Sequence, residues 1–519
     1  MLFFSLLLFK SLIGGRPRLE QGKIEAASLT APERKTVSTG ASESLAQLID
    51  GAINNSRLAS ARWGISVISL DDGRRVYGRN AEGLFTPASN MKIYTTAVAL
   101  DLLGADYRWR TSVYATTQPD ANGTIAGDLV LYGRGAPDLV ALPGKENSGS
   151  LVQLANDLYS RGVRRVTGNV IGDESYFRGQ PLGDGWPWTD VQWYFGAEAS
   201  ALSINKNEID INILPPNKSG APPQVRIQPA DKYVSVQNNM LTVRGGERMT
   251  IGIHRGLSDN AVRVWGEFPA DGKGYGARLA VHNPALWAAS LFHESLRDRG
   301  IAVDGVAAAR DSRQPPSKRF DPSTFTELAF ISSEPLSEIV RATNKASLNL
   351  YAELLLRTLG RERGVMLSTP EPPGRERGDD EAGLALIRLW LSRARISTEG
   401  LAFHDGSGLS RLNLVTPESI SRLLVSLSKS ASGTSFRQSL PVSGRDGTLG
   451  GRLSEITDRV AAKTGSLTYH SSLSGYVTSG SGQIWAFSII CNDHTTAASA
   501  NRVIDQIVTI LATHSPPTS

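Results

Sequence analysis

Three short motifs in this sequence together supply the serine and lysine side chains that acyl transfer needs. Residues 89–92 read Ser-Asn-Met-Lys, residues 347–349 read Ser-Leu-Asn, and residues 463–465 read Lys-Thr-Gly. A serine hydroxyl becomes a nucleophile when a neighbouring base takes its proton, and burial favours the neutral form of lysine that can do so. An S-x-x-K, an S-x-N and a K-T-G motif together are a known signature of acyl-forming serine enzymes. The candidate catalytic residues are therefore Ser89, Lys92, Ser347, Asn349 and Lys463.

Other copies of these motifs occur in the chain, so the letters alone do not locate a site. S-x-x-K recurs at 203–206 and 426–429, Ser-Asp-Asn occurs at 258–260, and Lys-Ser-Gly occurs at 218–220. The run 218–220 lies among turn residues beside prolines, and 258–260 precedes no long helix. These internal matches also follow a different order along the chain. Context and order therefore favour the set that begins at Ser89.

The local sequence around Ser89 favours a reactive hydroxyl. We expect Thr86 to cap a helix and Pro87 to occupy its first position, which puts Ser89 near the first turn. Backbone N–H groups there lack intrahelical acceptors, so the N–H of Ser89 can face a developing oxyanion. Lys92 lies three residues on, on the same helix face. A plain helix start with a solvent-facing lysine is the alternative.

The other two motifs lie where predicted elements meet. Ser347 and Asn349 join two apolar helical segments, so their side chains either project into a cleft or cap a helix. Lys463 follows the extended run 459–462 and is expected on a strand, where it adds positive charge for a carboxylate. Gly465 permits close approach of a ligand backbone. The alternative for Lys463 is an exposed side chain at an ordinary strand end.

The elements that must position these motifs fall into separate stretches of the chain. A length of 519 residues exceeds one ordinary core and predicts two or three domains. Residues 1–40 read as a leader and linker, either the remnant of an export signal or an apolar tail. Residues 41–107 and 324–519 are expected to form one mixed domain, interrupted by the inserted, β-rich residues 108–323.

Apolar periodicity predicts the elements of each stretch. The two outer stretches are expected to build a sheet that is split in sequence and covered by helices on both sides. Helices are expected there at 45–53, 86–103, 336–343, 350–359, 380–395, 417–427 and 498–513. Strands are expected there at 63–70, 75–77, 459–463, 473–478 and 483–491. The insertion is expected to hold one or two helices, such as 150–161 and 283–299, and strands at 109–114, 124–132, 163–171, 208–214, 225–227 and 262–268.

With its motifs in this order, the chain resembles the class C penicillin-binding proteins, the D-Ala-D-Ala carboxypeptidase/endopeptidase family of serine peptidases. Residues 85–92, Phe-Thr-Pro-Ala-Ser-Asn-Met-Lys, match the family's apolar-x-Pro-Ala-Ser-x-x-Lys segment. Residues 344–353, Asn-Lys-Ala-Ser-Leu-Asn-Leu-Tyr-Ala-Glu, are similar to its Asn-Lys-x-Ser-x-Asn-x-x-Ala-Glu block. Leu348 departs from that block, because the family usually has a polar residue such as Asp there.

The resemblance continues beyond the three motifs and covers about residues 45–510. Residues 405–410, Asp-Gly-Ser-Gly-Leu-Ser, together with Asn413 match the family's signature, and Gly-Thr-Leu at 447–449 and Lys-Thr-Gly-Ser-Leu at 463–467 complete it. Further family-like segments lie in the insertion, at Gly172-Asp173, Gly185-Trp186 and 201–205. As an ordered set these segments are specific.

The resemblance implies an α/β (α+β) fold: a penicillin-binding-protein or serine β-lactamase-like transpeptidase domain with a large, mostly β insertion. It also implies that Ser89 attacks the carbonyl between the two terminal D-alanines of a peptidoglycan stem peptide, while Lys92 takes its proton. Ser347 with Lys463 passes the proton to the leaving amine, and Asn349 holds the substrate amide. The backbone N–H groups of Ser89 and Ser466 form the oxyanion hole. The implied substrate-binding residues are Thr464, Gly465, Ser466 and Asp405.

The same resemblance predicts the partners and the location of the protein. Peptidoglycan muropeptides are the expected substrates, and β-lactam antibiotics are expected to acylate Ser89 as inhibitors. A serine mechanism needs no cofactor and no metal, and His293-Glu294 lacks the second histidine of a zinc motif. The expected location is periplasmic or otherwise extracytoplasmic, with at most peripheral membrane association.

Composition agrees with a globular protein. Hydrophobic residues make up 40% of the chain and charged residues 20%, and the formal net charge is only +5. No dense basic block interleaved with aromatic residues occurs, so nucleic-acid binding is not expected. The single cysteine, Cys491, cannot form an internal disulfide and is expected to pack in a strand. A single cysteine fits a cytoplasmic protein and also an exported protein without disulfides, so the cysteine count does not indicate the cellular compartment.

Three alternatives remain at the level of sequence. A β-lactamase shares the three motifs, but the long insertion and the signature at Asp405 argue against it. A Ser-His-Asp hydrolase could use His404 and Asp405, yet the chain has no G-x-S-x-G elbow. A catalytically silent peptidoglycan-binding module is the alternative from another class, and the presence of every motif side chain argues against it.

Overall fold

A computed structural model describes residues 44–141, 149–216, 220–230, 232–315, 319–367, 370, 372 and 374–515. The predicted leader and linker at 1–40 lies outside the described residues. The chain from Leu45 onward groups into one unit by its internal contacts. Within the described ranges, no helix combines the length and the apolar character needed to cross a membrane.

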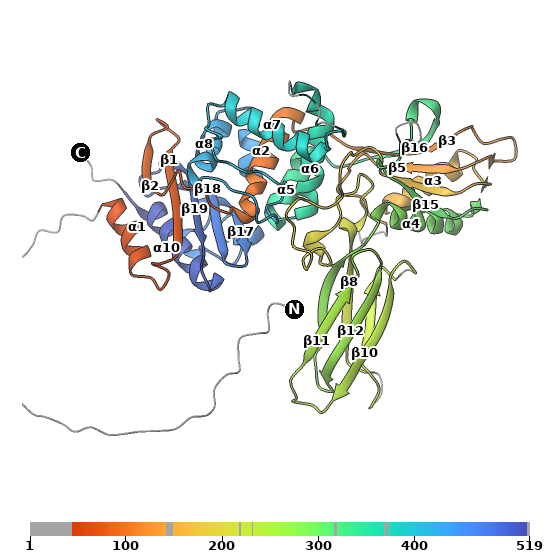
Figure 1. The fold of residues 1–519 in the computed structure, drawn as a ribbon, viewed down its shortest axis with the longest axis horizontal. Helices are drawn as coiled ribbons and strands as arrows, with labels where there is room; N and C mark the ends of the chain where they lie inside the picture. Colours follow the sequence, from red (N-terminus) through yellow and green to blue (C-terminus); the bar gives the residue numbers. More distant parts are fainter. Residues whose placement is uncertain are drawn as a thin grey trace, which may run out of the picture. The chain divides into compact units, whose positions relative to one another are not determined.

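One five-stranded antiparallel sheet is assembled from both outer stretches of the chain, in the order β17-β18-β19-β1-β2. Figure 1 shows the N-terminal strand β1 beside the C-terminal strand β19. Because β1 is a central strand with both faces covered, all its residues except Arg62 are buried and its sequence is apolar with small residues. The predicted sheet split in sequence is confirmed. Its strands are β1 (Arg62–Ser69), β2 (Arg75–Arg79), β17 (Val460–Leu467), β18 (His470–Thr478) and β19 (Ile484–Asn492).

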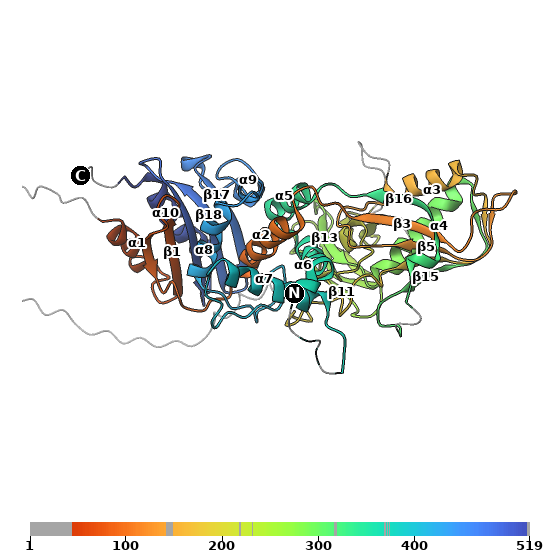
Figure 2. The ribbon, with the colours of Figure 1, turned by 90° about the horizontal axis from the view of Figure 1, so that it is seen from above.

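Helices cover both faces of this sheet, and each face has its own apolar core. On one face, α10 (Ala497–Thr513) packs on β18, and α1 (Leu45–Asn54) packs on α10. On the other face, α8 (Pro417–Ser428) packs on β1 and β19. Figures 1 and 2 show α1 and α10 on the opposite side of the sheet from α8. The predicted covering by helices on both sides is therefore confirmed.

Helix α2 (Met91–Leu103) runs through the centre of the helical layer. All of its residues from Met91 to Leu100 are buried, including Lys92, so this helix has no solvent-facing stripe over most of its length. Five helices that follow later in the sequence pack against it: α8 and, in addition, α5 (Leu336–Ala346), α6 (Asn349–Arg363), α7 (Asp379–Arg393) and α9 (Gly433–Ser439). A lysine on such a helix must find its partners inside the protein.

The residues between β3 and β16 form further sheets. A second five-stranded sheet has the order β15-β7-β5-β3-β16, and α4 packs on its strands β7 and β15 while α3 packs on α4. A three-stranded sheet has the order β14-β6-β4. The elements are β3 (Arg110–Ala115), β4 (Thr124–Ile125), β5 (Leu129–Tyr132), α3 (Ser150–Ser160), β6 (Arg165–Val166), β7 (Val170–Asp173), α4 (Pro284–Arg299), β14 (Ala302–Val303), β15 (Ala307–Arg310) and β16 (Thr326–Ser332).

Two other three-stranded sheets occupy the middle of the insertion, in the orders β13-β8-β9 and β10-β12-β11. Their strands form the green group at the lower part of Figure 1. The inner faces bury apolar residues such as Ile211 on β8 and Val264 on β12. The strands are β8 (Glu208–Leu214), β9 (Gln224–Gln228), β10 (Ser235–Val243), β11 (Thr250–Arg255), β12 (Ala261–Pro269) and β13 (Tyr275–Ala280).

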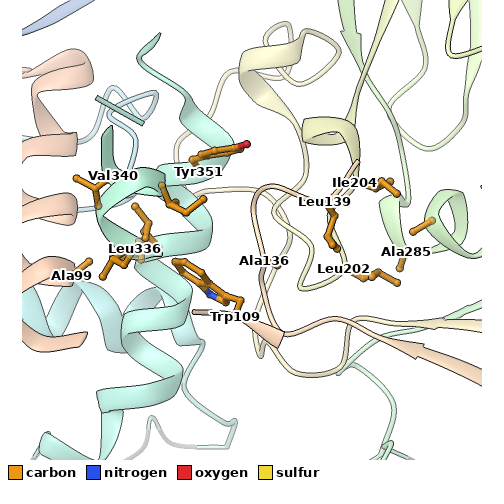
Figure 3. Close-up of a cluster of buried hydrophobic side chains, with 14 of the residues drawn as sticks. Ala99, Trp109, Ala136, Leu139, Leu202, Ile204, Ala285, Leu336, Val340 and Tyr351 are labelled. Atoms are coloured by element: carbon orange, nitrogen blue, oxygen red, sulfur yellow. The ribbon is translucent and has the colours of Figure 1, made fainter. Parts of the chain in front are cut away.

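One apolar core joins the insertion to the helices around α2. Figure 3 shows Leu336 and Val340 of α5 near Trp109, and Leu139 and Leu202 farther along the same cluster. The indole Nε1 of Trp109 donates a hydrogen bond to Thr358 Oγ1 of α6 at 2.9 Å. The insertion is thus packed against the helix that carries Asn349.

The paired strands of the insertion differ in detail from the predicted ones. The expected strand 124–132 is divided into β4 and β5, because Gly127 has a φ of 115° between them. The insertion sheet also extends past residue 323, since β16 pairs with β3. The predicted domain boundaries at 107 and 323 remain predictions.

Candidate active site

The turn that carries Ser89 differs from the expected helix start. Ser89 lies in a 3₁₀ turn, Ala88–Asn90, which leads directly into α2. The residue at the cap position is Pro87 and no side chain caps the turn, so the prediction that Thr86 caps the helix is wrong. The backbone of Thr86 is held from β19 instead: its N–H donates to Asn492 Oδ1 at 2.9 Å, and Asn492 Nδ2 donates to its carbonyl at 3.1 Å.

Lys92 is fully buried and its amine makes three contacts. Nζ lies 3.0 Å from Ser89 Oγ, 2.6 Å from Asn349 Oδ1 and 2.6 Å from the carbonyl oxygen of Ser407. Burial lowers the pKa of Lys92 to about 7, against the opposing effect of the Asp405 and Glu353 charges. A large part of this amine is therefore neutral near neutral pH.

The three contacts of Lys92 distinguish the roles of its partners. The oxygens of Asn349 and Ser407 can only accept hydrogen bonds, so they hold two N–H groups of a neutral amine. Ser89 alone offers a hydroxyl that can donate to the remaining lone pair. This arrangement fits a base that is poised to take the Ser89 proton.

Ser347 and Asn349 lie at the junction of α5 and α6. Ser347 follows the last residue of α5 with φ 56° and ψ 43°, a left-handed conformation that ends the helix, and Asn349 is the first residue of α6. Ser347 occupies the C-cap position of α5, no side chain of the described residues caps α6, and the side chains of Ser347 and Asn349 each contact a buried lysine. Ser347 Oγ contacts Lys463, whereas Asn349 contacts Lys92 and donates from Nδ2 to the carbonyl of Phe195 at 2.9 Å.

Lys463 is also fully buried, on strand β17 as predicted. Its Nζ lies 2.8 Å from Ser347 Oγ and 2.8 Å from the carbonyl oxygen of Thr464. Burial and, to a smaller degree, the charge of Lys92 hold the pKa of Lys463 well below its usual range. Because the two amines repel each other when both are charged, the site disfavours the doubly protonated state.

The K-T-G strand passes very close to the turn of Ser89. A Cβ on Gly465 would lie 2.2 Å from Ser472 Oγ, 2.8 Å from the Pro87 carbonyl and 3.1 Å from the Ser89 nitrogen. Only glycine fits at this position. On the two sides of Gly465 along the strand, the Thr464 hydroxyl donates to Thr448 Oγ1 at 2.8 Å, and Ser466 is exposed.

Asp405 supports the loop at 405–410 and does not offer a free carboxylate. It is buried and accepts hydrogen bonds from three side chains and two backbone N–H groups. The donors are Gly408 N at 2.8 Å, Ser410 N at 2.7 Å, Asn413 Nδ2 at 2.6 Å, Ser407 Oγ at 3.2 Å and Trp186 Nε1 at 2.9 Å. This loop places the Ser407 carbonyl on Lys92.

Three further residues at the site were not predicted as functional. Glu353 of α6 holds the same loop from its other side, Trp186 of the insertion holds Asp405, and Phe195 supplies a carbonyl to Asn349. Glu353 and Trp186 lie in segments that resemble the family, and this resemblance was the only feature of the sequence that pointed to them. Phe195 contributes a backbone atom, which leaves no signal in a sequence.

The structure thus brings the predicted catalytic residues together in two groups, each around one buried lysine. Lys92 contacts Ser89 and Asn349, and Lys463 contacts Ser347. The predicted substrate-binding residues Thr464, Gly465 and Ser466 lie on the same strand as Lys463.

Comparisons with known proteins identify the family of the chain. A model of the D-Ala-D-Ala carboxypeptidase 3 (S13) family matches residues 45–514. The chain is 32% identical over 507 residues to a D-alanyl-D-alanine carboxypeptidase from an Actinomadura species. The aligned region covers 92% of this chain and 89% of that protein. It is 27% identical to the D-alanyl-D-alanine carboxypeptidase DacB of Haemophilus influenzae, with 82% and 85% of the two chains covered.

A solved structure shows the same fold. The crystal structure of penicillin binding protein 4 (dacB) from Haemophilus influenzae matches with a TM-score of 0.76 at 23% identity, over 90% of this chain and 99% of that chain. The mixed helix-and-strand architecture expected from the sequence is confirmed.

Proposed function

Because the chain belongs to the D-Ala-D-Ala carboxypeptidase 3 family of serine peptidases, we propose that Ser89 is the residue through which it forms an acyl-enzyme. The protein is a serine-type D-Ala-D-Ala carboxypeptidase, a hydrolase. The family model spans 45–514, which supports this function over a silent peptidoglycan-binding module or a β-lactamase-like hydrolase. Both the carboxypeptidase and the endopeptidase reaction would open a D-alanine carbonyl by the same chemistry.

One observation carries the assignment of Ser89. Its hydroxyl lies 3.0 Å from a lysine amine whose pKa is lowered to about 7 and whose other two partners are pure acceptors. In the first step, Ser89 Oγ attacks the carbonyl between the two terminal D-alanines while Lys92 Nζ takes its proton. The N–H groups of Ser89 and Ser466 stabilise the oxyanion.

The second pair of residues serves the leaving group. Ser347 Oγ, 2.8 Å from Lys463 Nζ, gives its proton to the departing amine and receives in exchange the proton that Lys92 took from Ser89, so that Lys92 is neutral again before water attacks. The hydroxyls of Thr464 and Ser466, with Lys463, bind the terminal carboxylate. Water then hydrolyses the ester on Ser89 and returns its proton through Lys92.

Two predicted substrate contacts are revised in this proposal. Both ends of the Asn349 amide already have partners, Lys92 and Phe195, so its first task is to orient the base. The Asp405 carboxylate accepts five protein hydrogen bonds, so it acts by holding the 405–410 loop.

The proposed substrates are the stem peptides of peptidoglycan, and β-lactams are the proposed covalent inhibitors. A relative's structure was determined in complex with a β-lactam, which supports the second proposal. Because peptidoglycan lies outside the cytoplasmic membrane, we propose a periplasmic or other extracytoplasmic location.

The test compares wild type with Ser89→Ala in two assays: covalent labelling by a fluorescent penicillin and release of D-alanine from a D-Ala-D-Ala pentapeptide. Wild type is expected to be active in both and Ser89→Ala in neither. Ser426→Ala is the matched control, since Ser426 begins another S-x-x-K motif, on α8, and should retain full activity. Labelling that persists in Ser89→Ala would overturn the assignment.

A further inference from the structure

Three residues of α6 form a column that leads to the lysine base. Asn349, Glu353 and Arg357 are spaced four residues apart, so they lie on one face of the helix. Asn349 contacts Lys92 directly, whereas Glu353 and Arg357 lie deeper and are essentially inaccessible to solvent. Two buried charges this close to a catalytic amine need a reason, because burying an ion pair costs more than its attraction commonly returns.

The Glu353 carboxylate is bound on both of its oxygens. Oε1 accepts the backbone N–H groups of Gly406 and Ser407 at 3.0 and 2.9 Å, and Oε2 accepts the Arg357 guanidinium at 2.8 Å. Burial, together with the charge of Asp405, raises the pKa of the Glu353 carboxyl, and the Arg357 guanidinium and the Ser407 N–H oppose that rise. The three donors fix the orientation of the carboxylate. Arg357 is held in turn by the carbonyl of Gln180 in the insertion at 3.1 Å.

The loop that Glu353 holds is the one that touches the base. The peptide unit after Ser407 presents its carbonyl oxygen to Lys92 Nζ at 2.6 Å, and the N–H of the same Ser407 points at Glu353. Asp405 holds the opposite side of this loop through Gly408 and Ser410. Without Glu353, the segment from Gly406 to Ser407 loses both of its anchors on α6.

We propose that Glu353 is a positioning residue for the reaction: by binding the N–H groups of Gly406 and Ser407, it holds the Ser407 carbonyl where it orients the Lys92 amine toward Ser89. This inference rests on the proposed roles of Ser89 and Lys92. It assigns to the buried ion pair Glu353–Arg357 a part in catalysis and not merely in packing. Glu353 acts through the loop and touches neither Ser89 nor Lys92 by a hydrogen bond.

The charge of Glu353 provides a signature that packing alone does not. The charged groups facing Lys92 are Asp405 on the loop, Glu353 on α6 and Lys463 on β17, with Arg357 behind Glu353. The negative charge of Glu353 raises the pKa of Lys92, so its removal lowers that pKa further. Because the neutral amine is the active form, the acid limb of the pH profile then moves to lower pH.

The experiment measures the second-order rate of acylation by a fluorescent penicillin as a function of pH, in the full chain. For Glu353→Gln, the acid limb is expected to move to lower pH, and the plateau rate is expected to fall about ten- to hundredfold because the Ser407 carbonyl is released. For Glu353→Asp, which keeps the charge but is one methylene shorter, the plateau falls while the limb does not move to lower pH.

The control is Asp505→Asn. Asp505 lies on α10, and its Oδ1 forms a half-buried ion pair with Arg452 Nη2 at 2.7 Å, which this substitution breaks. It is expected to lower the melting temperature and to leave the pH profile unchanged. If Glu353→Gln does not fold, Glu353→Asp decides: a plateau equal to wild type overturns the inference. A folded Glu353→Gln with a wild-type limb and plateau also overturns it. A wild-type protein that is not labelled at all contradicts the proposed function itself.

Discussion

The chemistry depends on the environment of one amine. Lys92 is enclosed on α2, which removes water from its amine and favours the neutral form, while carbonyl and amide oxygens hold its two N–H groups. Its lone pair is left for the Ser89 hydroxyl. Lys463 repeats the arrangement with Ser347, so each serine of the site has its own buried lysine.

Replacing the amine tests its role as the base. Lys92→Met keeps much of the length of the side chain but has no basic group, so acylation by penicillin is expected to fall about 10²- to 10⁴-fold. Stopped-flow or gel-based labelling gives the rate, and circular dichroism checks that the variant is folded. A folded Lys92→Met that is acylated at the wild-type rate would show that another group takes the Ser89 proton.

The pH dependence of acylation follows from the same amine. Burial lowers the pKa of Lys92 to about 7, and only the neutral amine can accept a proton. The acylation rate is therefore expected to fall as the pH drops through about 7 and to level off above it. A rate that is equal in acidic and alkaline buffers, at constant penicillin integrity, contradicts a lysine base.

At the scale of elements, the site depends on how closely β17 approaches the turn of Ser89. Gly465 lets the strand lie against Pro87 and Ser89, and Ser472 on β18 ties the two together by donating from Oγ to the Pro87 carbonyl at 2.7 Å. The approach sets the spacing between the nucleophile and the strand that binds the substrate carboxylate in the proposed mechanism.

A methyl group at this position should separate the two elements. Gly465→Ala is expected to cost about 1–3 kcal/mol of unfolding free energy through overpacking, and to slow acylation at least about tenfold by displacing β17. Thermal unfolding and penicillin labelling measure the two effects. Gly451→Ala is the control, because a Cβ there meets no atom within 4 Å. Equal rates in both variants would contradict the proposed role of the close approach.

The elements that the sequence predicted are those with strong periodicity. Strand β8 was predicted with its observed bounds. Helices α3 and α4 each differ from the prediction by one residue at one end, and α6 differs by one residue at its start and four at its end. The strand β10 was missed because Asn238 and Asn239 interrupt its apolar pattern, although both are exposed on the sheet. Helix α9 was also missed, because its seven residues are too few to show the periodic spacing of apolar residues that predicts a helix.

At the scale of the whole molecule, the insertion contributes directly to the site. Trp186 donates to Asp405, Phe195 accepts from Asn349 and Gln180 accepts from Arg357, so one segment of the insertion supports both the signature loop and α6. Removal of the insertion would therefore take one hydrogen-bond partner each from Asp405, Asn349 and Arg357.

The contact of Trp186 offers a test of this support. Trp186→Phe keeps an aromatic ring but removes the donor to Asp405 Oδ2, and is expected to cost about 1–3 kcal/mol and to lower kcat/KM for D-alanine release. Trp188→Phe is the matched control, since the Trp188 side chain is 70% exposed. Identical melting temperatures and kcat/KM values for the two variants would argue against a supporting role for Trp186.

The site was predicted in part. The three motifs predicted Ser89, Lys92, Ser347, Asn349 and Lys463 as one site because their residue types and order are specific, and the structure places their side chains in contact with two buried lysines. The Thr86 cap was wrong because its backbone is held by Asn492, a partner 406 residues away that no local pattern reveals. The support from Phe195 and Gln180 was missed for the same reason, since both act through backbone carbonyls.

The most direct measurement of the central claim is the location of the acyl group. The full chain is incubated with penicillin, its intact mass is determined, and the adduct is mapped by peptide digestion and tandem mass spectrometry. The account predicts a single penicilloyl adduct on the peptide that contains Ser89, and none in Ser89→Ala. An adduct on Ser347, Ser426 or any other residue of the wild-type chain, or no adduct at all, would contradict it.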